Sequence, residues 1–181
     1  MRSRIIYKRA ESHQELTQIL ELQRTNYSSS ISIEEKKQEG FVTVVHDFDI
    51  LKKMNDTCAH IIAKHQDTVV GYALCMLKAF KDDIEVLKPI FHQINTCLKP
   101  DQTYMTMGQI CIDKAYRKQG IFRGLYNCMK ENLQLEFDMV ITEVDLENTR
   151  SVNAHYTIGF RDLHFYNSNN QEWALIFWDW S

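Results

Sequence analysis

The stretch GQICIDKAYRKQGIFRGL, residues 108–125, carries the pattern that decides the fold. In its first part, side chains alternate between two faces as in a strand, with Ile110 and Ile112 on one face. A short polar and basic segment then leads to Gly120. From Phe122 onward, apolar residues recur at the three-and-four spacing of one helix face. The sequence therefore predicts a strand, a tight basic turn and the start of a helix, in that order.

Such a turn is suited to binding an anion. The first N–H groups of a helix have no partner within the helix, and the helix dipole adds positive potential there. Arg117, Lys118 and Arg123 flank the turn, which favours a phosphate group. The alternative is that these cations form an ordinary solvated face. Two common nucleotide patterns are absent, because no Lys-Ser/Thr pair follows Gly124 and there is no G-x-G-x-x-G motif.

Two motifs resemble a known family. RKQGIF, residues 117–122, resembles motif A of the GCN5-related N-acetyltransferases (GNAT), a strand followed by Arg/Gln-x-x-Gly-x-Gly/Ala, although Phe122 departs from its last position. EVDLENTRSVNAHYTIGF, residues 143–160, resembles motif B, in which Asn148 follows a strand and Gly159-Phe160 ends the next helix. The two motifs occur in the family order, and the chain is identified as similar to this family.

The resemblance implies acetyl-coenzyme A as the acyl donor, bound where the parallel strands at residues 104–113 and 139–144 splay apart. The amide-rich pantetheine arm can pair with a strand that lacks a neighbour. Backbone amides of residues 119–123 would hold the pyrophosphate, and the Ile112 N–H would stabilise the developing oxyanion. No metal is expected. The expected cofactor-binding residues are Ile110, Cys111, Ile112, Arg117, Lys118, Gln119, Gly120, Ile121, Phe122, Arg123, Asn148 and Ser151.

The implied reaction is direct acetyl transfer, in a ternary complex, to a primary amine of a small molecule or peptide. An amine of pKa ~10.4 must first lose a proton, at a cost of about 4 kcal/mol at pH 7. Glu143 is the candidate base, and the alternative is an exposed carboxylate at a strand end. His155 stands where many family members carry a Tyr, so His155, its neighbour Tyr156 or no residue protonates the leaving thiolate. The alternative to an enzyme is a non-catalytic regulatory module that binds acyl-coenzyme A.

The whole pattern predicts a single α/β domain over residues 1–181. Its sheet is expected to be mixed and mostly antiparallel, with six to seven strands, helices on both faces and a splayed central parallel pair. Residues 82–98 read as helical, with Pro89 either kinking the helix or opening a second piece. Strands are expected at 4–10, 58–64, 69–80, 104–113, 139–144, 160–166 and 173–178, and further helices at 12–27, 47–54, 122–137 and 149–158.

Aromatic residues outside the motifs leave two questions open. Four early residues either form a wall of the acceptor site or occupy ordinary core or loop positions. They are Tyr27, Phe41, His46 and Phe48. A homodimer surface and completion of the core are alternatives for the C-terminal aromatic strand, Trp173, Phe177, Trp178 and Trp180. The identity of the acceptor stays open as well.

Composition excludes several other classes. A net charge of −3 disfavours wholesale binding to nucleic acid or to an anionic membrane. No run approaches the ~18 apolar residues of a membrane span, and the first fifteen residues do not read as a signal peptide. The five cysteines form no C-x-x-C pair, so no zinc site or disulfide framework is expected. Free thiols favour a cytoplasmic location.

Overall fold

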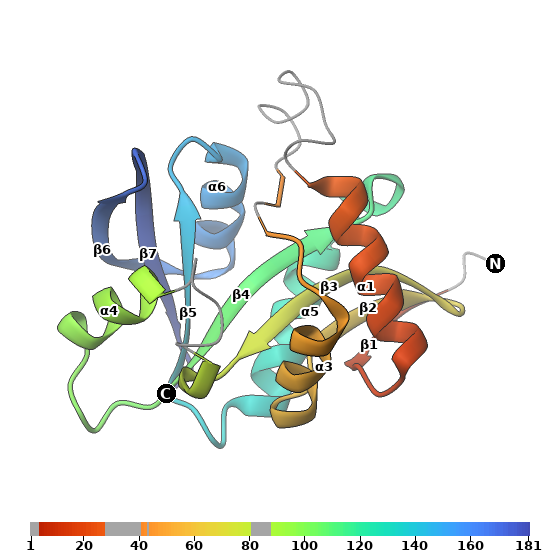
Figure 1. The fold of residues 1–181 in the computed structure, drawn as a ribbon, viewed down its shortest axis with the longest axis horizontal. Helices are drawn as coiled ribbons and strands as arrows, with labels where there is room; N and C mark the ends of the chain where they lie inside the picture. The colour runs from red at the N-terminus through yellow and green to blue at the C-terminus, as the bar shows by residue number, and fades with distance from the viewer. Residues whose placement is uncertain (1–3, 28–40, 43, 81–87) are drawn as a thin grey trace.

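The computed structural model describes residues 4–27, 41–42, 44–80 and 88–181, which form a seven-stranded sheet with helices on both faces (Figure 1). The strands are β1 (Ile5–Arg9), β2 (Ile61–His65), β3 (Thr68–Met76), β4 (Tyr104–Ile112), β5 (Met139–Asp145), β6 (Arg161–Ser168) and β7 (Gln171–Asp179). The helices are α1 (His13–Asn26), α3 (Phe48–Thr57), α4 (Lys88–Cys97), α5 (Ile121–Leu133) and α6 (Thr149–Ile158), with short 3-10 turns at Lys78–Phe80 and Lys114–Tyr116. Within these residues no helix is both long and apolar enough to cross a membrane.

The sheet confirms the expected mixed topology. Its strand order is β1-β2-β3-β4-β5-β7-β6, and every neighbouring pair is antiparallel except β4 with β5. The parallel pair begins at Tyr104 opposite Met139 and ends at Thr106 opposite Ile141. Beyond that point β4 continues to Ile112 and β5 to Asp145 without further pairing between them in the described chain. The predicted splayed pair is therefore present.

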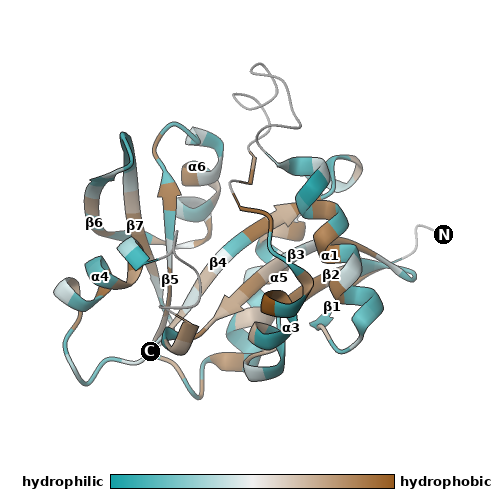
Figure 2. Ribbon diagram, viewed as in Figure 1, coloured by the Kyte–Doolittle hydropathy of each residue, from teal (hydrophilic) through white to brown (hydrophobic). Residues whose placement is uncertain are grey.

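Helices bury apolar side chains on each face of the sheet, and β3 is buried along almost its whole length. Hydrophobic residues run along this central strand (Figure 2). On one face α1, α3 and α4 contribute Ile19, Leu51 and Phe91. On the other face α5 and α6 pack, with Leu125 and Met129 among the buried residues. A fully buried Leu or Phe side chain contributes roughly 1.5–3 kcal/mol, so two continuous layers hold the sheet rigid around its gap.

Several element boundaries differ from the sequence expectation. The capping box at Ser12 is confirmed, and Pro89 is the second residue of α4, where its missing N–H is not needed; residues 82–87 lie outside the described part. The strand expected from Cys58 begins instead at Ile61, because the Cys58 N–H donates to Met54 O (2.9 Å) and closes α3.

Helix α5 ends four residues before the expected Phe137. The chain turns there because the Asp138 N–H donates to Thr103 O (3.1 Å), which places the next residue at the start of β5. The turn is closed by the Phe137 N–H, which donates to Leu133 O (3.1 Å). The short connection fixes the register at which β4 and β5 begin to pair.

Candidate functional site

Two adjoining cavities follow the gap between β4 and β5. The first has a volume of about 220 Å³ and lies at the end of β4, the turn after it and the starts of α5 and α6. The second, of about 280 Å³, lies against the middle of β4, the end of β5 and the β6–β7 hairpin. Both are lined by Phe41, Val42, Ile110, Asn148 and Ser151. The two cavities therefore form one continuous space, called the cleft below.

The edge of β4 that faces the gap carries backbone groups with no strand beside them. The Asp113 N–H donates to Val70 O at 2.9 Å, so this peptide points toward β3. The N–H groups of successive residues in a strand point to opposite sides. The Ile112 N–H therefore points away from β3 into the gap, and so does the Ile110 N–H two residues earlier. The Ile112 carbonyl on that side accepts a hydrogen bond from Arg117 Nε (3.1 Å). The predicted backbone donors are thus placed beside the cleft.

The turn into α5 presents a helix N-terminus to the first cavity. Gly120 precedes the helix with φ of 81°, a left-handed conformation that glycine adopts without strain. A Cβ at Gly120 would meet nothing within 4 Å, so backbone conformation rather than space favours glycine here. No side chain of the described residues caps the N–H groups that open α5. The N–H groups expected to bind an anion therefore lie at Gly120 and in the first turn of α5.

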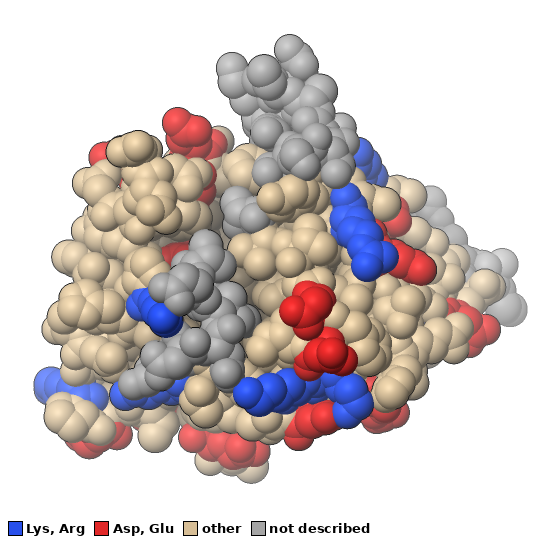
Figure 3. Space-filling model, in the orientation of Figure 1, with Lys and Arg blue, Asp and Glu red and all other residues tan. Residues whose placement is uncertain are grey.

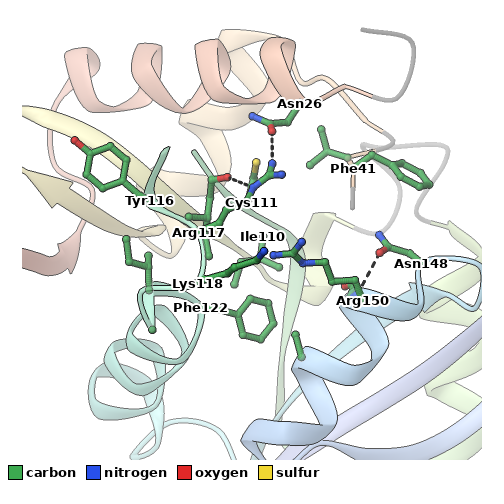
Figure 4. A pocket seen from close by; sticks show the side chains of 16 residues that line it. Asn26, Phe41, Ile110, Cys111, Tyr116, Arg117, Lys118, Phe122, Asn148 and Arg150 are labelled. Atoms are coloured by element: carbon green, nitrogen blue, oxygen red, sulfur yellow. Dashed lines mark hydrogen bonds between the residues drawn. The ribbon is translucent and has the colours of Figure 1, made fainter. Parts of the chain in front are cut away.

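Arg117 and Lys118, two of the expected cofactor-binding residues, both line the first cavity. The Arg117 guanidinium also donates to Asn26 Oδ1 at 2.6 Å, which links the turn to the end of α1 (Figure 4). Asn26 in turn accepts the Val42 N–H on its backbone oxygen (3.1 Å). Arg117 therefore supports the cleft as well as adding positive charge to it.

The side chains of Gln119 and Arg123 lie outside the cleft lining, so the positive charge of Arg123 does not line the first cavity. Gln119 Nε2 donates to Ala115 O at 3.1 Å, and an Arg123 nitrogen donates to Thr157 O at 3.1 Å. Only their backbone amides belong to the turn. Arg150, in the first turn of α6, lines the first cavity and was missed from the sequence. Its position two residues after Asn148 was the available signal.

Apolar residues of the motif close the inner side of the first cavity. The Phe122 ring lines it, with its centroid 5.0 Å from the His155 ring and 5.3 Å from the Tyr126 ring. Ile121 is buried beneath it. Cys111 is buried too, and burial raises the pKa of its thiol to about 12, so it stays a neutral thiol. Phe122 therefore replaces a small family residue with a ring packed between α5 and α6.

Asn148 and Ser151 lie where the two cavities meet. Asn148 is the N-cap of α6, and its Oδ1 accepts the Ser151 N–H at 3.2 Å. Both residues line both cavities. A second helix N-terminus thus faces the cleft, on the side opposite α5.

Glu143 lies on β5 just past the last residue paired with β4, and its side chain faces the second cavity. Its Oε2 accepts a hydrogen bond from the hydroxyl of Tyr166 on β6. Burial raises the pKa of Glu143 to about 7, and the bond from Tyr166 opposes that rise. The alternative of an exposed strand-end carboxylate is therefore wrong, and the carboxyl titrates near neutrality.

The two candidate acids do not reach the cleft in a form that donates a proton. His155 is 1% exposed; its Nδ1 donates to Ser151 O (2.7 Å), and its Nε2 accepts from the Tyr126 hydroxyl (2.8 Å). Burial lowers the pKa of His155 to about 4, so the ring is neutral at pH 7. The Tyr156 hydroxyl bonds Asp162 Oδ1 (2.6 Å), outside both cavities. Neither side chain therefore presents a proton to the cleft.

Of the four candidate wall residues, Phe41 lines the cleft. His46 is buried, with its N–H donating to Gln23 Oε1 (2.9 Å), and Phe48 packs edge-on against His13. Tyr27 packs against the core. The neighbouring Val44, Pro89 and Gln109 line the second cavity and were not foreseen.

Gln109 holds the wall in place. Its Nε2 donates to Val44 O at 2.8 Å, and its Oε1 accepts the buried Tyr72 hydroxyl at 2.6 Å. Gln109 lies on the face of β4 opposite Ile110 and Ile112, and its partner Val44 lies 65 residues away in sequence. Over the face that carries α1, α3 and α4, basic and acidic side chains are interspersed (Figure 3).

Comparison with known proteins gives one sequence match. The sequence model of the acetyltransferase (GNAT) family matches residues 16–160 of the chain. That range contains the whole turn at Gly120 and the segment from Glu143 to Phe160. No curated protein sequence matches the chain.

Solved structures share the fold. Arabidopsis thaliana NAA60 in complex with acetyl-CoA superposes with a TM-score of 0.69 at 12% identity, covering 97% of this chain and 99% of that one. The NatC complex bound to Gag peptide and CoA gives 0.66 at 13% identity, covering 97% and 98%. The ribosomal-protein-S18-alanine N-acetyltransferase of Escherichia coli gives 0.64 at 11% identity, covering 98% and 95%. At these identities the likeness establishes the fold.

Proposed function

The chain belongs to the GNAT family of acetyltransferases, and from this premise we propose that it acetylates a primary amine of a small molecule or peptide. The proposed reaction is direct transfer from acetyl-coenzyme A while donor and acceptor are bound together. The observation that carries the proposal is the gap between β4 and β5, which joins an N–H cradle at Gly120 to a carboxyl at Glu143.

The residues present fit acetyl-coenzyme A. The N–H groups at the start of α5, with Lys118 and Arg117 beside them, suit a pyrophosphate. The gap-facing N–H groups of Ile110 and Ile112 suit the pantetheine amides. When bound, acetyl-coenzyme A supplies the acetyl group as a thioester, which amines attack readily.

On the acceptor side, Glu143 would take the proton that the amine must lose. A base with a pKa near the working pH is most effective, and Glu143 has been raised to about 7. Its Oε1 has no partner among the described residues, which leaves that oxygen for the acceptor. A thiol of pKa ~8.5 is a tolerable leaving group, so transfer can proceed although neither His155 nor Tyr156 is placed to donate a proton.

The proposal is tested by two measurements on the same preparation. Isothermal titration with acetyl-coenzyme A measures binding, and mass spectrometry after incubation with a panel of amines and peptides detects acetylated products. Binding with turnover of at least one amine supports the proposal. Binding without turnover of any amine would favour the regulatory module, and absence of binding would contradict the assignment of the cleft.

A further inference from the structure

Tyr166 lies at the acceptor end of the cleft. It lines the second cavity together with Glu143, and it also lines a more open space of about 520 Å³ between α4 and the β6–β7 hairpin. It does not line the first cavity, where the pyrophosphate cradle is. An acceptor that reaches Glu143 from the space under α4 therefore passes the ring of Tyr166.

The position of its hydroxyl is set by the sheet. Tyr166 pairs with Trp173 across β6 and β7, its ring stacks on His164 at a centroid distance of 6.5 Å, and its apolar part packs against the core. Burial, and then the charge of Glu143, raise the pKa of Tyr166 well above its usual range, so the phenol keeps its proton. The hydroxyl is therefore a fixed donor aimed at one carboxyl oxygen.

Donation to Oε2 orients Glu143. A free Glu side chain on a strand has several rotamers, and one firm hydrogen bond selects among them. With Oε2 occupied, Oε1 is the oxygen of Glu143 that has no partner among the described residues. We infer that Tyr166 is a positioning residue for acetyl transfer, holding Glu143 so that Oε1 meets the acceptor amine. This inference rests on the proposed function.

Removing the hydroxyl should change both the geometry and the titration of Glu143. A donor stabilises the carboxylate more than the carboxylic acid, so its loss raises the pKa of Glu143 further. Among the residues that the structure describes, Asp145 on β5 and His155 on α6 also line that cavity. His164 on β6 stacks on Tyr166, and Lys88 and His92 on α4 line the adjoining space. A Tyr-to-Phe change leaves all of them in place.

The test compares Tyr166→Phe with Tyr104→Phe. Tyr104 lies on β4, and its buried hydroxyl has no partner among the described residues. Tyr104→Phe therefore removes the same oxygen atom as Tyr166→Phe without breaking a hydrogen bond. In Tyr166→Phe we expect kcat at pH 7 to fall about tenfold and the acidic limb of kcat/KM to move up by about one pH unit. KM for acetyl-coenzyme A should not change. Tyr104→Phe should match the wild type in all three measurements.

A second readout does not depend on activity. Carbon-13 NMR of the labelled Glu143 carboxyl, assigned by its loss in Glu143→Gln, should show a higher pKa in Tyr166→Phe than in the wild type. If Tyr166→Phe fails to fold, 3-fluorotyrosine at position 166 keeps the ring and is a stronger donor, so both the limb and the NMR pKa should move down.

The outcomes separate the two claims. A wild type that binds acetyl-coenzyme A but acetylates no amine overturns the proposed function, and the inference falls with it. An active wild type whose acidic limb is unchanged in Tyr166→Phe overturns the inference alone. A shifted NMR pKa with an unchanged limb also overturns it, because the hydroxyl would then act on Glu143 without affecting transfer.

Discussion

Gly120 holds the turn before α5 in a left-handed conformation, next to N–H groups that no described side chain caps. Gly120→Glu has room for its Cβ but brings a negative charge to the proposed pyrophosphate position. We expect acetyl-coenzyme A affinity to fall at least 100-fold by isothermal titration. Gly120→Ala is the control, because it adds only the backbone strain of roughly 1–2 kcal/mol. Equal affinity in Gly120→Glu and Gly120→Ala would contradict the cradle.

The proposed role of Glu143 as the base predicts how its substitution changes the rate of acetyl transfer. Glu143→Gln keeps the shape of the side chain but cannot accept the proton, so kcat should fall by about 10²–10³ with little change in the dissociation constant of acetyl-coenzyme A. The rise of kcat/KM through pH 7, expected from the raised pKa of Glu143, should disappear. Steady-state kinetics from pH 5.5 to 9 measure both effects. Full activity across this range would remove Glu143 from the mechanism.

Residue-level prediction from sequence succeeded where a position is set by local pattern. The turn at Gly120 and the placement of Glu143 one strand away follow from motif spacing. The surroundings of His155 did not, because its hydrogen-bond partner Tyr126 lies on another helix and nothing near His155 in sequence indicates the contact. Tyr166 was missed as a site residue for the same reason, since its partner Glu143 is 23 residues away.

At the scale of elements, two threonines mark where β4 and β5 part. Thr142 Oγ1 donates to Met107 O across the gap at 2.9 Å, whereas the buried Thr106 Oγ1 has no partner among the described residues. Thr142→Val leaves a buried carbonyl without its donor, so the free energy of unfolding should fall by about 1–2 kcal/mol. Thr106→Val removes an unsatisfied hydroxyl and should be neutral or stabilising. Urea unfolding monitored by circular dichroism compares the two.

An equal loss in both threonine variants would mean that the bond from Thr142 does not hold the strands at the edge of the gap.

Element order and type were predictable, because strand alternation and helix spacing are local properties. Boundaries were less predictable. A local helical bond from the Cys58 N–H to Met54 O delays the start of β2, and a tertiary contact from the Asp138 N–H to Thr103 O sets the start of β5.

For the whole molecule, buried titratable groups determine how stability depends on pH. Burial lowers the pKa values of His46, His60 and His155 to about 4, so between pH 6.5 and 4.5 the unfolded chain binds more protons than the folded one. Glu143 acts in the opposite direction over this window, because its folded-state pKa of about 7 lies above its unfolded value. Three groups therefore oppose one as the pH falls.

A fully titrating group contributes about 1.4 kcal/mol per pH unit, and these groups titrate only partly at the edges of the window. The free energy of unfolding should therefore fall by about 2 kcal/mol per unit between pH 6.5 and 4.5. Urea melts at pH 6.5, 5.5 and 4.5 measure the slope. Glu143→Gln removes the opposing contribution, so its slope should be steeper. A stability that does not change over this window would contradict the neutral state of the buried histidines.

Asn26 has a consequence for the order of events in a catalytic cycle. Its side-chain oxygen accepts a hydrogen bond from Arg117, in the turn before α5. Its backbone oxygen accepts the N–H of Val42, which lines the cleft. The buried Asn26 thus connects two parts of the cleft lining. On the proposed function, we expect the binding of either substrate to increase the affinity for the other. Thermodynamic reciprocity requires the same enhancement factor in both directions, and Asn26→Ala should bring that factor close to one when the two substrates are titrated in either sequence.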